Sequence, residues 1–283
     1  MLVAPNLLDD LIRHALEEDL LGGDLTTEAT VEPDAMAVGH ALARSELVVC
    51  GADVFTRVFW LLDGGLRVIT LVPDGTRVSA GTELWRVEGS ARSILIGERT
   101  ALNFVQRMSG VATQARRYVD ALPPNCKTRV TDTRKTTPGL RALERYAVRT
   151  GGAYNHRDSL GSAVLIKDNH IEAAGGISTA IERARQRAPH TCRIEVEVET
   201  LEGLDEALRA HADIVMLDNF EPDQLRTAIE RCRGQAMVEV SGKITLARIA
   251  ELGALGVDIV SSGALTHSVM AADIALDIER LGA

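Results

Sequence analysis

The fold is decided by a repeated unit, and its clearest copy is RIEVEVETLEGLDEALRAHADIVMLDNF at residues 193–220. Two short apolar strands, at 193–199 and 213–218, flank a helical stretch of about a dozen residues. Segments of the same kind lie at 127–134, 162–168, 236–241 and 257–263. Six short apolar strands that alternate with helices predict βα units and a parallel sheet.

Polar residues follow all six strands. In chain order they are Arg134-Lys135, Lys167-Asp168, Glu197 with Glu199, Asp218-Asn219, Ser241-Gly242 and Ser262-Gly263. The carboxyl ends of parallel strands converge on one mouth if the sheet closes into a barrel, whereas an open doubly wound sheet spreads them along an edge. If polar residues merely marked the ends of strands, one or two of these positions would be explained, but hardly all six. Six units rather than eight therefore predict an atypical, about six-stranded α/β barrel.

An N-terminal α+β domain, sandwich-like in its alternation, is expected at residues 1–112. A helix near Leu7–Asp19 is followed by alternating stretches at 41–51 and 66–89, which predict antiparallel strands. A long helix from about Gly97 to Asp120 leads into the barrel.

The barrel is predicted to occupy residues 113–268 and to carry the phosphate-binding and catalytic groups. The segment 269–283 predicts a helix whose apolar residues Ile274, Ile278 and Leu281 need cover. We expect that helix to pack back on the N-terminal domain.

Composition limits the classes of function. The chain has 283 residues, 46% of them apolar, and a formal net charge of -9, so it can bury a large core. An acidic chain with only 3% aromatic residues is a poor candidate for nucleic-acid binding. The start of the chain lacks a signal-peptide pattern and no segment approaches ~18 consecutive apolar residues, so we expect neither export nor a membrane span.

The four cysteines predict the compartment. They lie far apart in sequence, without a CxxC pair or a Cys/His cluster, at Cys50, Cys126, Cys192 and Cys232. This spacing predicts reduced thiols in a cytoplasmic protein and disfavours a structural zinc site or a disulfide framework.

A basic island interrupts this acidic chain between Thr131 and Arg157. Three of its arginines, Arg141, Arg145 and Arg149, are spaced by four and are interpreted as the solvated face of a helix with Glu144 as a neighbour. The remaining cations lie among loop-forming residues, at Arg134, Lys135, His156 and Arg157. Since guanidinium groups fit carboxylates and phosphates, we expect a small polyanionic ligand there.

The mouth of the predicted barrel combines two opposite charges. Its cationic half adds Lys167 to the four loop cations, and its anionic half contains Glu197 and Asp218. The two Ser-Gly steps follow the last two strands, where barrels often bind phosphate through backbone N–H groups and a following helix. A bound Mg²⁺ ion would offset the repulsion between these carboxylates and a phosphate. Glu197 and Asp218 could instead act in acid–base catalysis or stabilise a developing cation.

Several ordered motifs resemble one enzyme family. They are GDLTTEAT, GERTALNFVQRMSGVAT, TDTRKTTPGLRALERYAVRTGGAYNHR, LIKDNHI, IEVEVET, IVMLDNF, VSG and GALTHS, and they run from about Asp24 to about His267. Their order and spacing are similar to those of quinolinate phosphoribosyltransferase, also called carboxylating nicotinate-nucleotide pyrophosphorylase. The resemblance implies that quinolinate displaces pyrophosphate from 5-phosphoribosyl-1-pyrophosphate and loses CO₂, giving nicotinate mononucleotide for NAD biosynthesis.

The resemblance also implies residue roles. The quinolinate pocket would contain Arg99, Arg134, His156, Arg157 and Lys167, with Arg99 donated across a homodimer interface. Lys135 would lie near the pyrophosphate and, with Lys167, Glu197 and Asp218, would be catalytic. Glu197 and Asp218 would hold the ribose hydroxyls and Mg²⁺, in part through water. The 5-phosphate loops would contain Ser241, Gly242, Lys243, Gly263 and Ala264.

Two positions and the substrate stay open at this point. Lys243 departs from the small or amide residue common in the family, and either contacts phosphate or points to solvent. His267 is interpreted as structural rather than as a ligand. The alternatives are a related pyrophosphorylase with another substrate, a nicotinate phosphoribosyltransferase, and a sugar-phosphate sensor without catalysis. The Asn155-His156-Arg157 step argues against the related pyrophosphorylase. The large number of cations argues against a nicotinate phosphoribosyltransferase, whose substrate has one carboxylate. The carboxylates Glu197 and Asp218 argue against a sensor, which would not need them.

Overall fold

The computed structural model describes residues 4–282, which form two compact units. The first unit contains residues 4–116, 137–152 and 268–282, and the second contains Arg117–Thr136 and Ala153–His267. The boundary falls inside the long helix α4, Ala91–Asp120, close to the predicted boundary at residue 112. Among the helices of the described residues, none has the length and apolar character needed to cross a bilayer.

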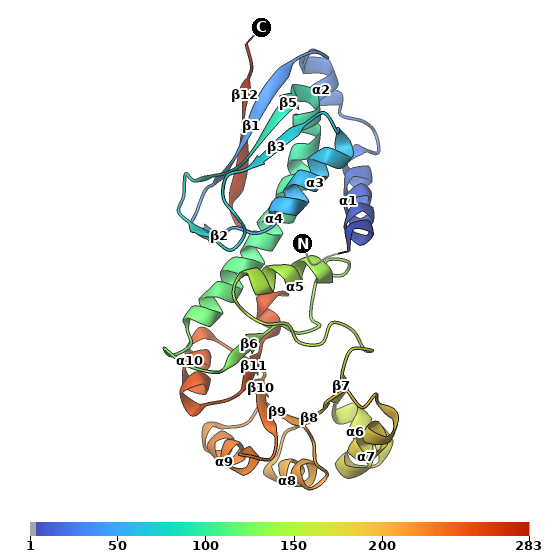
Figure 1. The fold of residues 1–283 in the computed structure, drawn as a ribbon, viewed down its shortest axis with the longest axis vertical. Coiled ribbons are helices and arrows are strands. Elements are labelled where there is room, and N and C mark those ends of the chain that lie inside the picture. The colour runs from blue at the N-terminus through green and yellow to red at the C-terminus, as the bar shows by residue number, and fades with distance from the viewer. Residues whose placement is uncertain (1–3, 283) are drawn as a thin grey trace. The chain divides into compact units, whose positions relative to one another are not determined.

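The first unit is built on a four-stranded antiparallel sheet in the order β12-β1-β5-β3 (Figure 1). Its elements are α1 (Pro5–Leu20), α2 (Leu25–Thr30), β1 (Met36–Ala43), α3 (Ala52–Leu62), β3 (Arg67–Thr70), β5 (Glu83–Ser90) and β12 (Ile274–Arg280), with a small β2 (Leu47–Val48) and β4 (Arg77–Val78) pair. Phe55 of α3 stacks on Trp85 of β5 at 4.9 Å between ring centroids. The predicted alternation of antiparallel strands is confirmed.

The predicted C-terminal helix is wrong. Residues Ile274–Arg280 form strand β12, which pairs antiparallel with β1 from Ala43↔Ile274 to Ala37↔Arg280. The segment IALDIER also alternates with period two, and the open edge of β1 supplies its hydrogen-bond partners. The helical spacing that suggested a buried face does not describe the packing, because Ile278 is 44% exposed and Leu281 is 45% exposed.

Helix α5 (Arg141–Thr150) belongs to the first unit and not to the predicted barrel domain. Its Glu144 is 1% exposed and accepts hydrogen bonds from Arg107 of α4, at 2.7 Å from Nη2, and from the Thr137 hydroxyl at 2.7 Å. The interpretation of Glu144 as a solvated neighbour is therefore wrong, because the carboxylate is buried and pairs with the half-buried Arg107 of an earlier helix. Arg149 is exposed as expected, whereas Arg141 and Arg145 are half-buried.

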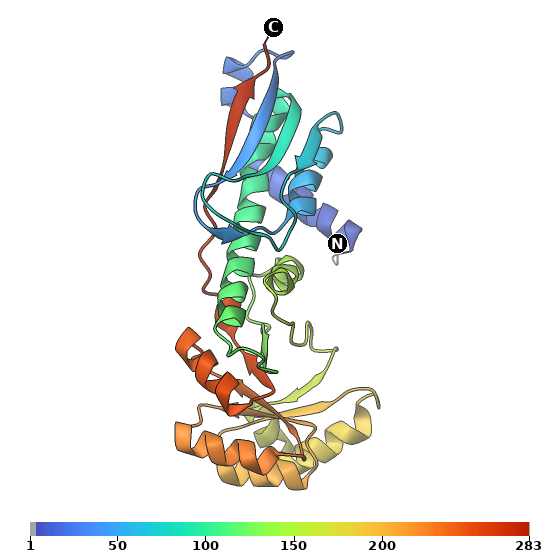
Figure 2. The same cartoon turned by 60° about the vertical axis from the view of Figure 1, so that its left-hand side comes forward.

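The second unit contains the predicted six-stranded parallel sheet, in the order β6-β11-β10-β9-β8-β7. Its strands are β6 (Arg129–Thr131), β7 (Val164–Ile166), β8 (Ile194–Val198), β9 (Ile214–Asp218), β10 (Met237–Ser241) and β11 (Ile259–Ser261). The helices are α6 (Asp168–Ala174), α7 (Ile177–Arg187), α8 (Leu201–Arg209), α9 (Pro222–Cys232) and α10 (Leu246–Leu255), with the short 3₁₀ helix η1 (Gly263–Leu265). Figure 2 shows α7, α8 and α9 along one side of the sheet.

The segment after α5 lies beside the edge strand β6. Tyr154 forms a parallel bridge with Thr131, and three residues later the Arg157 guanidinium donates to the carbonyl of Ala163 at 3.2 Å, just before β7. This segment therefore links the two edge strands of the sheet. The predicted atypical six-stranded α/β architecture with an N-terminal α+β domain is confirmed.

Candidate active site

A cavity of about 310 Å³ lies at the carboxyl ends of the parallel strands in the second unit. Its lining residues are Thr133, Arg134, Lys135, His156, Arg157, Leu165, Lys167, Met216, Glu239, Ser241 and Ser261. The predicted site residues among them are Arg134, Lys135, His156, Arg157, Lys167 and Ser241. The convergence expected from the strand ends is therefore present in the structure.

A second, larger hollow of about 740 Å³ lies at the opposite, amino-terminal ends of the strands. Its acidic residues have structural partners: Asp213 accepts from the Ile194 N–H at 2.7 Å, and Asp258 accepts from the Val238 N–H at 2.8 Å. Since α/β barrels carry their chemistry at the carboxyl ends, we assign the site to the smaller cavity.

Asp132 holds the loop that carries His156 and Arg157. Its carboxylate is fully buried and accepts from the Asn155 amide at 2.6 Å and from the backbone N–H of His156 at 2.7 Å. In the sequence, Asp132 is one of the few acidic residues of the basic island, and no role was predicted for it. Its position directly after β6, among cations, is the signal that marks it as an anchor for the loop.

The cationic and anionic halves of the mouth meet directly. The Lys167 ammonium forms an ion pair with Glu197. Burial and the repulsion from Glu197 raise the pKa of Asp218, while Lys167 and Lys135 lower it. These four side chains therefore form one electrostatic cluster, as the strand-end pattern predicted.

This cluster suits a divalent cation. Glu197 and Asp218 offer carboxylate oxygens, the ligands that Mg²⁺ prefers. Burial and, after it, the repulsion from Glu197 raise the pKa of Asp218, and a bound cation would relieve that repulsion. The residues present therefore fit the predicted metal.

The first of the two predicted phosphate loops contains a glycine that no other residue can replace without strain. Gly242 has φ +86°, and a Cβ atom there would lie 2.8 Å from the Asp218 carboxylate. Lys243 also has a positive φ, of 43°, and its side chain is exposed. Its predicted phosphate contact stays a prediction.

The second loop differs from the prediction in its helix. Only the three-residue η1 follows β11, and its Ala264 N–H donates to Ser262 Oγ at 3.3 Å. A Cβ atom at Gly263 would lie 2.8 Å from the ring of His267 and 3.0 Å from Lys135 Cδ. His267 thus packs beside this loop.

Arg99 lies in the first unit, on α4. Its Nη2 atom is 3.8 Å from the carboxylate of Glu98. The other predicted pocket residues all belong to the second unit.

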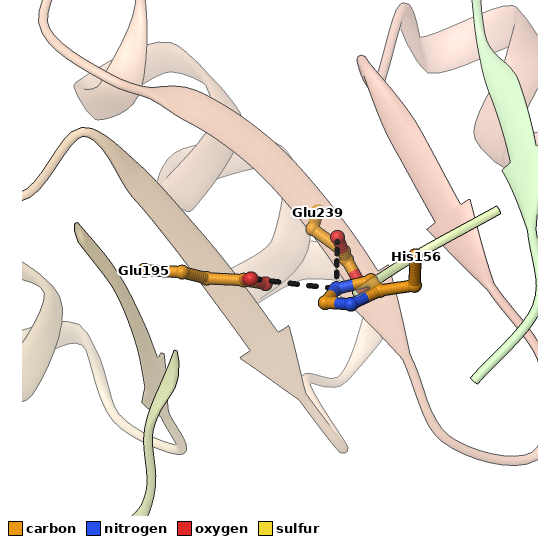
Figure 3. Close-up of side chains that lie close together, drawn as sticks. All are labelled: His156, Glu195 and Glu239. Atoms are coloured by element: carbon orange, nitrogen blue, oxygen red, sulfur yellow. Dashed lines mark ion pairs between the residues drawn. The ribbon is translucent and has the colours of Figure 1, made fainter. Parts of the chain in front are cut away.

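Two buried carboxylates at the cavity were not predicted. Oε2 of Glu195 lies 3.3 Å, and Oε2 of Glu239 lies 3.4 Å, from Nε2 of His156 (Figure 3). The signal in the sequence is alternation, because Glu195 is two residues before Glu197 and Glu239 is two residues before Ser241. Prediction from strand ends alone does not include these residues, which lie one step deeper on the same strands.

The two carboxylates change the proton affinity of His156. Burial acts to lower the pKa of His156, but hydrogen bonds with Glu195 and Glu239 raise it to about 10. Burial also raises the pKa of Glu195. The two carboxylates therefore favour a proton on Nε2 of His156, the ring nitrogen that they face.

Comparison with known proteins identifies the family. The model of the quinolinate phosphoribosyl transferase N-terminal domain matches residues 24–109, and that of the C-terminal domain matches residues 111–277. The carboxylating nicotinate-nucleotide pyrophosphorylase of Mycobacterium leprae (strain TN) is 44% identical over 275 residues, covering 95% of this chain and 96% of the relative. The quinolinate phosphoribosyltransferase [decarboxylating] 1 of Nicotiana glauca is 40% identical over an alignment of 291 residues, covering 96% and 82%.

Solved structures agree with the sequence comparison. The crystal structure of NadC from Streptococcus pyogenes matches with a TM-score of 0.94 and 41% identity, covering 99% of each chain. Both predicted domains of the family are thus present in one chain, in the expected order. The chain belongs to the quinolinate phosphoribosyltransferase family.

Proposed function

We propose that this protein transfers the phosphoribosyl group of 5-phosphoribosyl-1-pyrophosphate to quinolinate, with decarboxylation, and so produces nicotinate mononucleotide for NAD biosynthesis. The observation that carries the proposal is the cavity at the strand ends, lined by Arg134, Lys135, Arg157 and Lys167, with Glu197 paired to one of these cations. Both substrates are polyanions, so a strongly cationic cavity suits them.

The dicarboxylate side of the pocket would use the guanidinium groups of Arg134 and Arg157 and the ammonium group of Lys167, with His156 as part of the wall. Guanidinium groups bind carboxylates through two parallel hydrogen bonds, which orient as well as attract. When quinolinate binds, Lys167 would exchange the Glu197 carboxylate for a substrate carboxylate. That exchange would free Glu197 for the second substrate.

The phosphoribosyl side would use the opposite strand ends. Backbone N–H groups of the two loops would bind the 5-phosphate, at Ser241, Gly242, Lys243, Gly263 and Ala264. Lys135 would contact the pyrophosphate group. Glu197 and Asp218 would hold the ribose hydroxyls and, in part through water, Mg²⁺, which when bound supplies positive charge to the pyrophosphate oxygens.

The reaction then needs positioning more than covalent help from the protein. The ring nitrogen of quinolinate forms a bond to the anomeric carbon while the bond to pyrophosphate breaks, and Glu197 and Asp218 would favour the oxocarbenium-like transition state. Loss of CO₂ leaves an electron pair on the ring carbon, which takes up a proton. The cations of the pocket would stabilise this negative charge.

We further propose that the enzyme acts as a homodimer in which Arg99 of the partner subunit completes the quinolinate pocket. The support is the family membership together with the position of Arg99 in the first unit, on a helix rather than at a strand end. The cytoplasm is our proposed location, since the buried Cys50 and Cys232 are free thiols, which suit a reducing compartment.

The activity itself can be tested with purified protein. Supplied with quinolinate, 5-phosphoribosyl-1-pyrophosphate and Mg²⁺, it should release nicotinate mononucleotide, pyrophosphate and CO₂, measured by chromatography and by trapping of labelled CO₂. Nicotinate in place of quinolinate is the control. Turnover of nicotinate without turnover of quinolinate would refute the proposed substrate.

Removal of divalent metal should stop the reaction. Without the cation, the negative carboxylates of Glu197 and Asp218 would repel the pyrophosphate group. Product formation is measured after chelation and again after Mg²⁺ is restored, with binding of quinolinate as the control that should survive chelation. Turnover unaffected by chelation would remove the metal from the mechanism.

Single substitutions in the cationic pocket should abolish most activity without unfolding the protein. Arg134→Ala and Lys167→Ala should each lower kcat/KM for quinolinate by about 100-fold or more, because truncating one side of a buried charge pair costs about 3 kcal/mol. Arg13→Ala, which removes an exposed cation of α1, is the matched control and should leave turnover unchanged. Near-normal activity of either pocket variant would contradict the assignment.

Mixed dimers test the shared site. An Arg99→Ala chain and an Arg134→Ala chain are each expected to be inactive as homodimers, but a heterodimer has one site in which both arginines are intact. Recovery of about half the wild-type activity per heterodimer is expected, measured on dimers purified with two different affinity tags. Verified heterodimers without recovered activity would show that Arg99 does not act across the interface.

A further inference from the structure

Glu195 and Glu239 lie in the interior of the second unit, one layer below the strand ends. Successive strand residues point to opposite faces, so Glu195 shares its face with Glu197 on β8 and Glu239 shares its face with Ser241 on β10. The interior of an α/β barrel is normally filled by branched apolar side chains. Carboxylates that are only 4% and 1% exposed are costly there, and their presence needs a reason.

Stability of the fold does not provide that reason. Among the described residues, neither Oε1 of Glu195 nor Oε1 of Glu239 has a hydrogen-bond partner. A buried carboxylate with an unsatisfied oxygen destabilises a protein relative to an apolar residue of similar volume. A few well-placed polar groups in a cavity are typical of binding sites, and Glu239 lines the cavity.

Both carboxylates point at the same atom, Nε2 of His156 (Figure 3). The other ring nitrogen, Nδ1, accepts a hydrogen bond from the backbone N–H of Arg157 at 2.8 Å. A nitrogen that accepts carries no proton, so a ring with one proton carries it on Nε2, between the two carboxylates. The imidazole is therefore held at both nitrogens by the protein, and His156 lines the cavity.

The same three residues have the composition of a metal site, since their ligand atoms lie within 4.8 Å of one another. A metal at Nε2 would require that nitrogen to be unprotonated, with the ring proton on Nδ1. The backbone N–H of Arg157 donates a hydrogen bond to Nδ1, which leaves no place for a proton on that nitrogen. The hydrogen bonding thus favours an orienting role over a metal site.

The charge of this layer also acts on the neighbouring cations. Burial lowers the pKa of Arg157 and the adjacent Arg134 lowers it further, whereas Glu195 raises it. Two guanidinium groups at one small cavity repel each other, and the buried negative charge offsets that repulsion while the cavity is empty.

We propose that Glu195 and Glu239 are positioning residues of the dicarboxylate pocket and act through His156. They hold the imidazole with Nε2–H between them, and thereby fix one wall of the cavity and the backbone from which the Arg157 side chain starts. This inference rests on the proposed function, because quinolinate is the ligand whose binding it explains.

Binding of quinolinate to the full chain, measured by calorimetry, tests the inference. Glu239→Leu removes the acceptor with little change of volume and should weaken quinolinate binding by about 10-fold or more, as misplaced binding groups do. Glu239→Gln keeps an acceptor oxygen for Nε2–H and should stay within about 3-fold of wild type. The melting temperature of each variant shows whether it is folded.

The double variant with His156→Ala separates a role through His156 from an independent one. In the His156→Ala background, Glu239→Leu should have no further weakening effect on binding. Fully additive losses would overturn the inference. So would binding by Glu239→Leu that equals or exceeds wild type, which is the result expected if the carboxylates only repel the dianionic ligand.

Nitrogen NMR of the imidazole in the wild-type protein gives a measurement that no folding defect can disturb. We expect a protonated Nε2, both before and after quinolinate is added. A ring protonated at Nδ1 and not at Nε2, in either state, would overturn the inference. Failure of the wild-type protein to bind quinolinate would instead refute the proposed function, while the spectrum of the ligand-free protein would still test the arrangement of His156.

Discussion

The hydrogen bonds of Asp132 are the contacts on which the site depends. The chain leaves the second unit after Thr136, contributes residues 137–152 to the first unit, and returns at Ala153. The Asp132 carboxylate lies before this excursion and binds Asn155 and His156 after it. Cations from both sides of the excursion, Arg134 and Arg157, therefore line one cavity. Because the carboxylate is fully buried, its charge-assisted hydrogen bonds are stronger than they would be in water.

Opposite charges at the strand ends reduce the repulsion between the cations of the site. A pocket for polyanions needs cations at short range, and cations at short range repel one another. The Lys167–Glu197 ion pair and the buried carboxylates below His156 supply negative charge at two depths of the same cavity. Substrate carboxylates and phosphates would take over these interactions, so the cations need little rearrangement on binding.

Sequence reasoning could predict those parts of the structure that local patterns determine. The strand ends could be predicted because a parallel sheet places every carboxyl end at one edge, and the residues at Arg134, Lys167, Glu197 and Asp218 are polar without exception. The resemblance to the family added roles that the pattern alone left open.

The parts that failed depend on partners distant in sequence. Strand β12 forms because the edge of β1 is available, and the short segment IALDIER fits both a helical and a strand period. Glu144 is buried because Arg107 reaches it from another helix, and the spacing of arginines on α5 contains no sign of that contact. Asp132 was visible as one of two acids in the basic island, yet its two acceptor roles depend on a loop that returns to the second unit only at Ala153.

The unpredicted carboxylates show how strand alternation extends a site inward. A residue two positions before a functional strand end occupies the same face, one layer deeper, and in this barrel β8 and β10 both place a glutamate there. The strand between them, β9, places Ile214 opposite Glu195 and Met216 opposite Glu239, so each buried glutamate has an apolar neighbour on β9. In this interior, two carboxylates take the place of apolar side chains and orient one imidazole ring. The loss of apolar packing is expected only where the oriented ring has a function, and His156 lines the binding cavity.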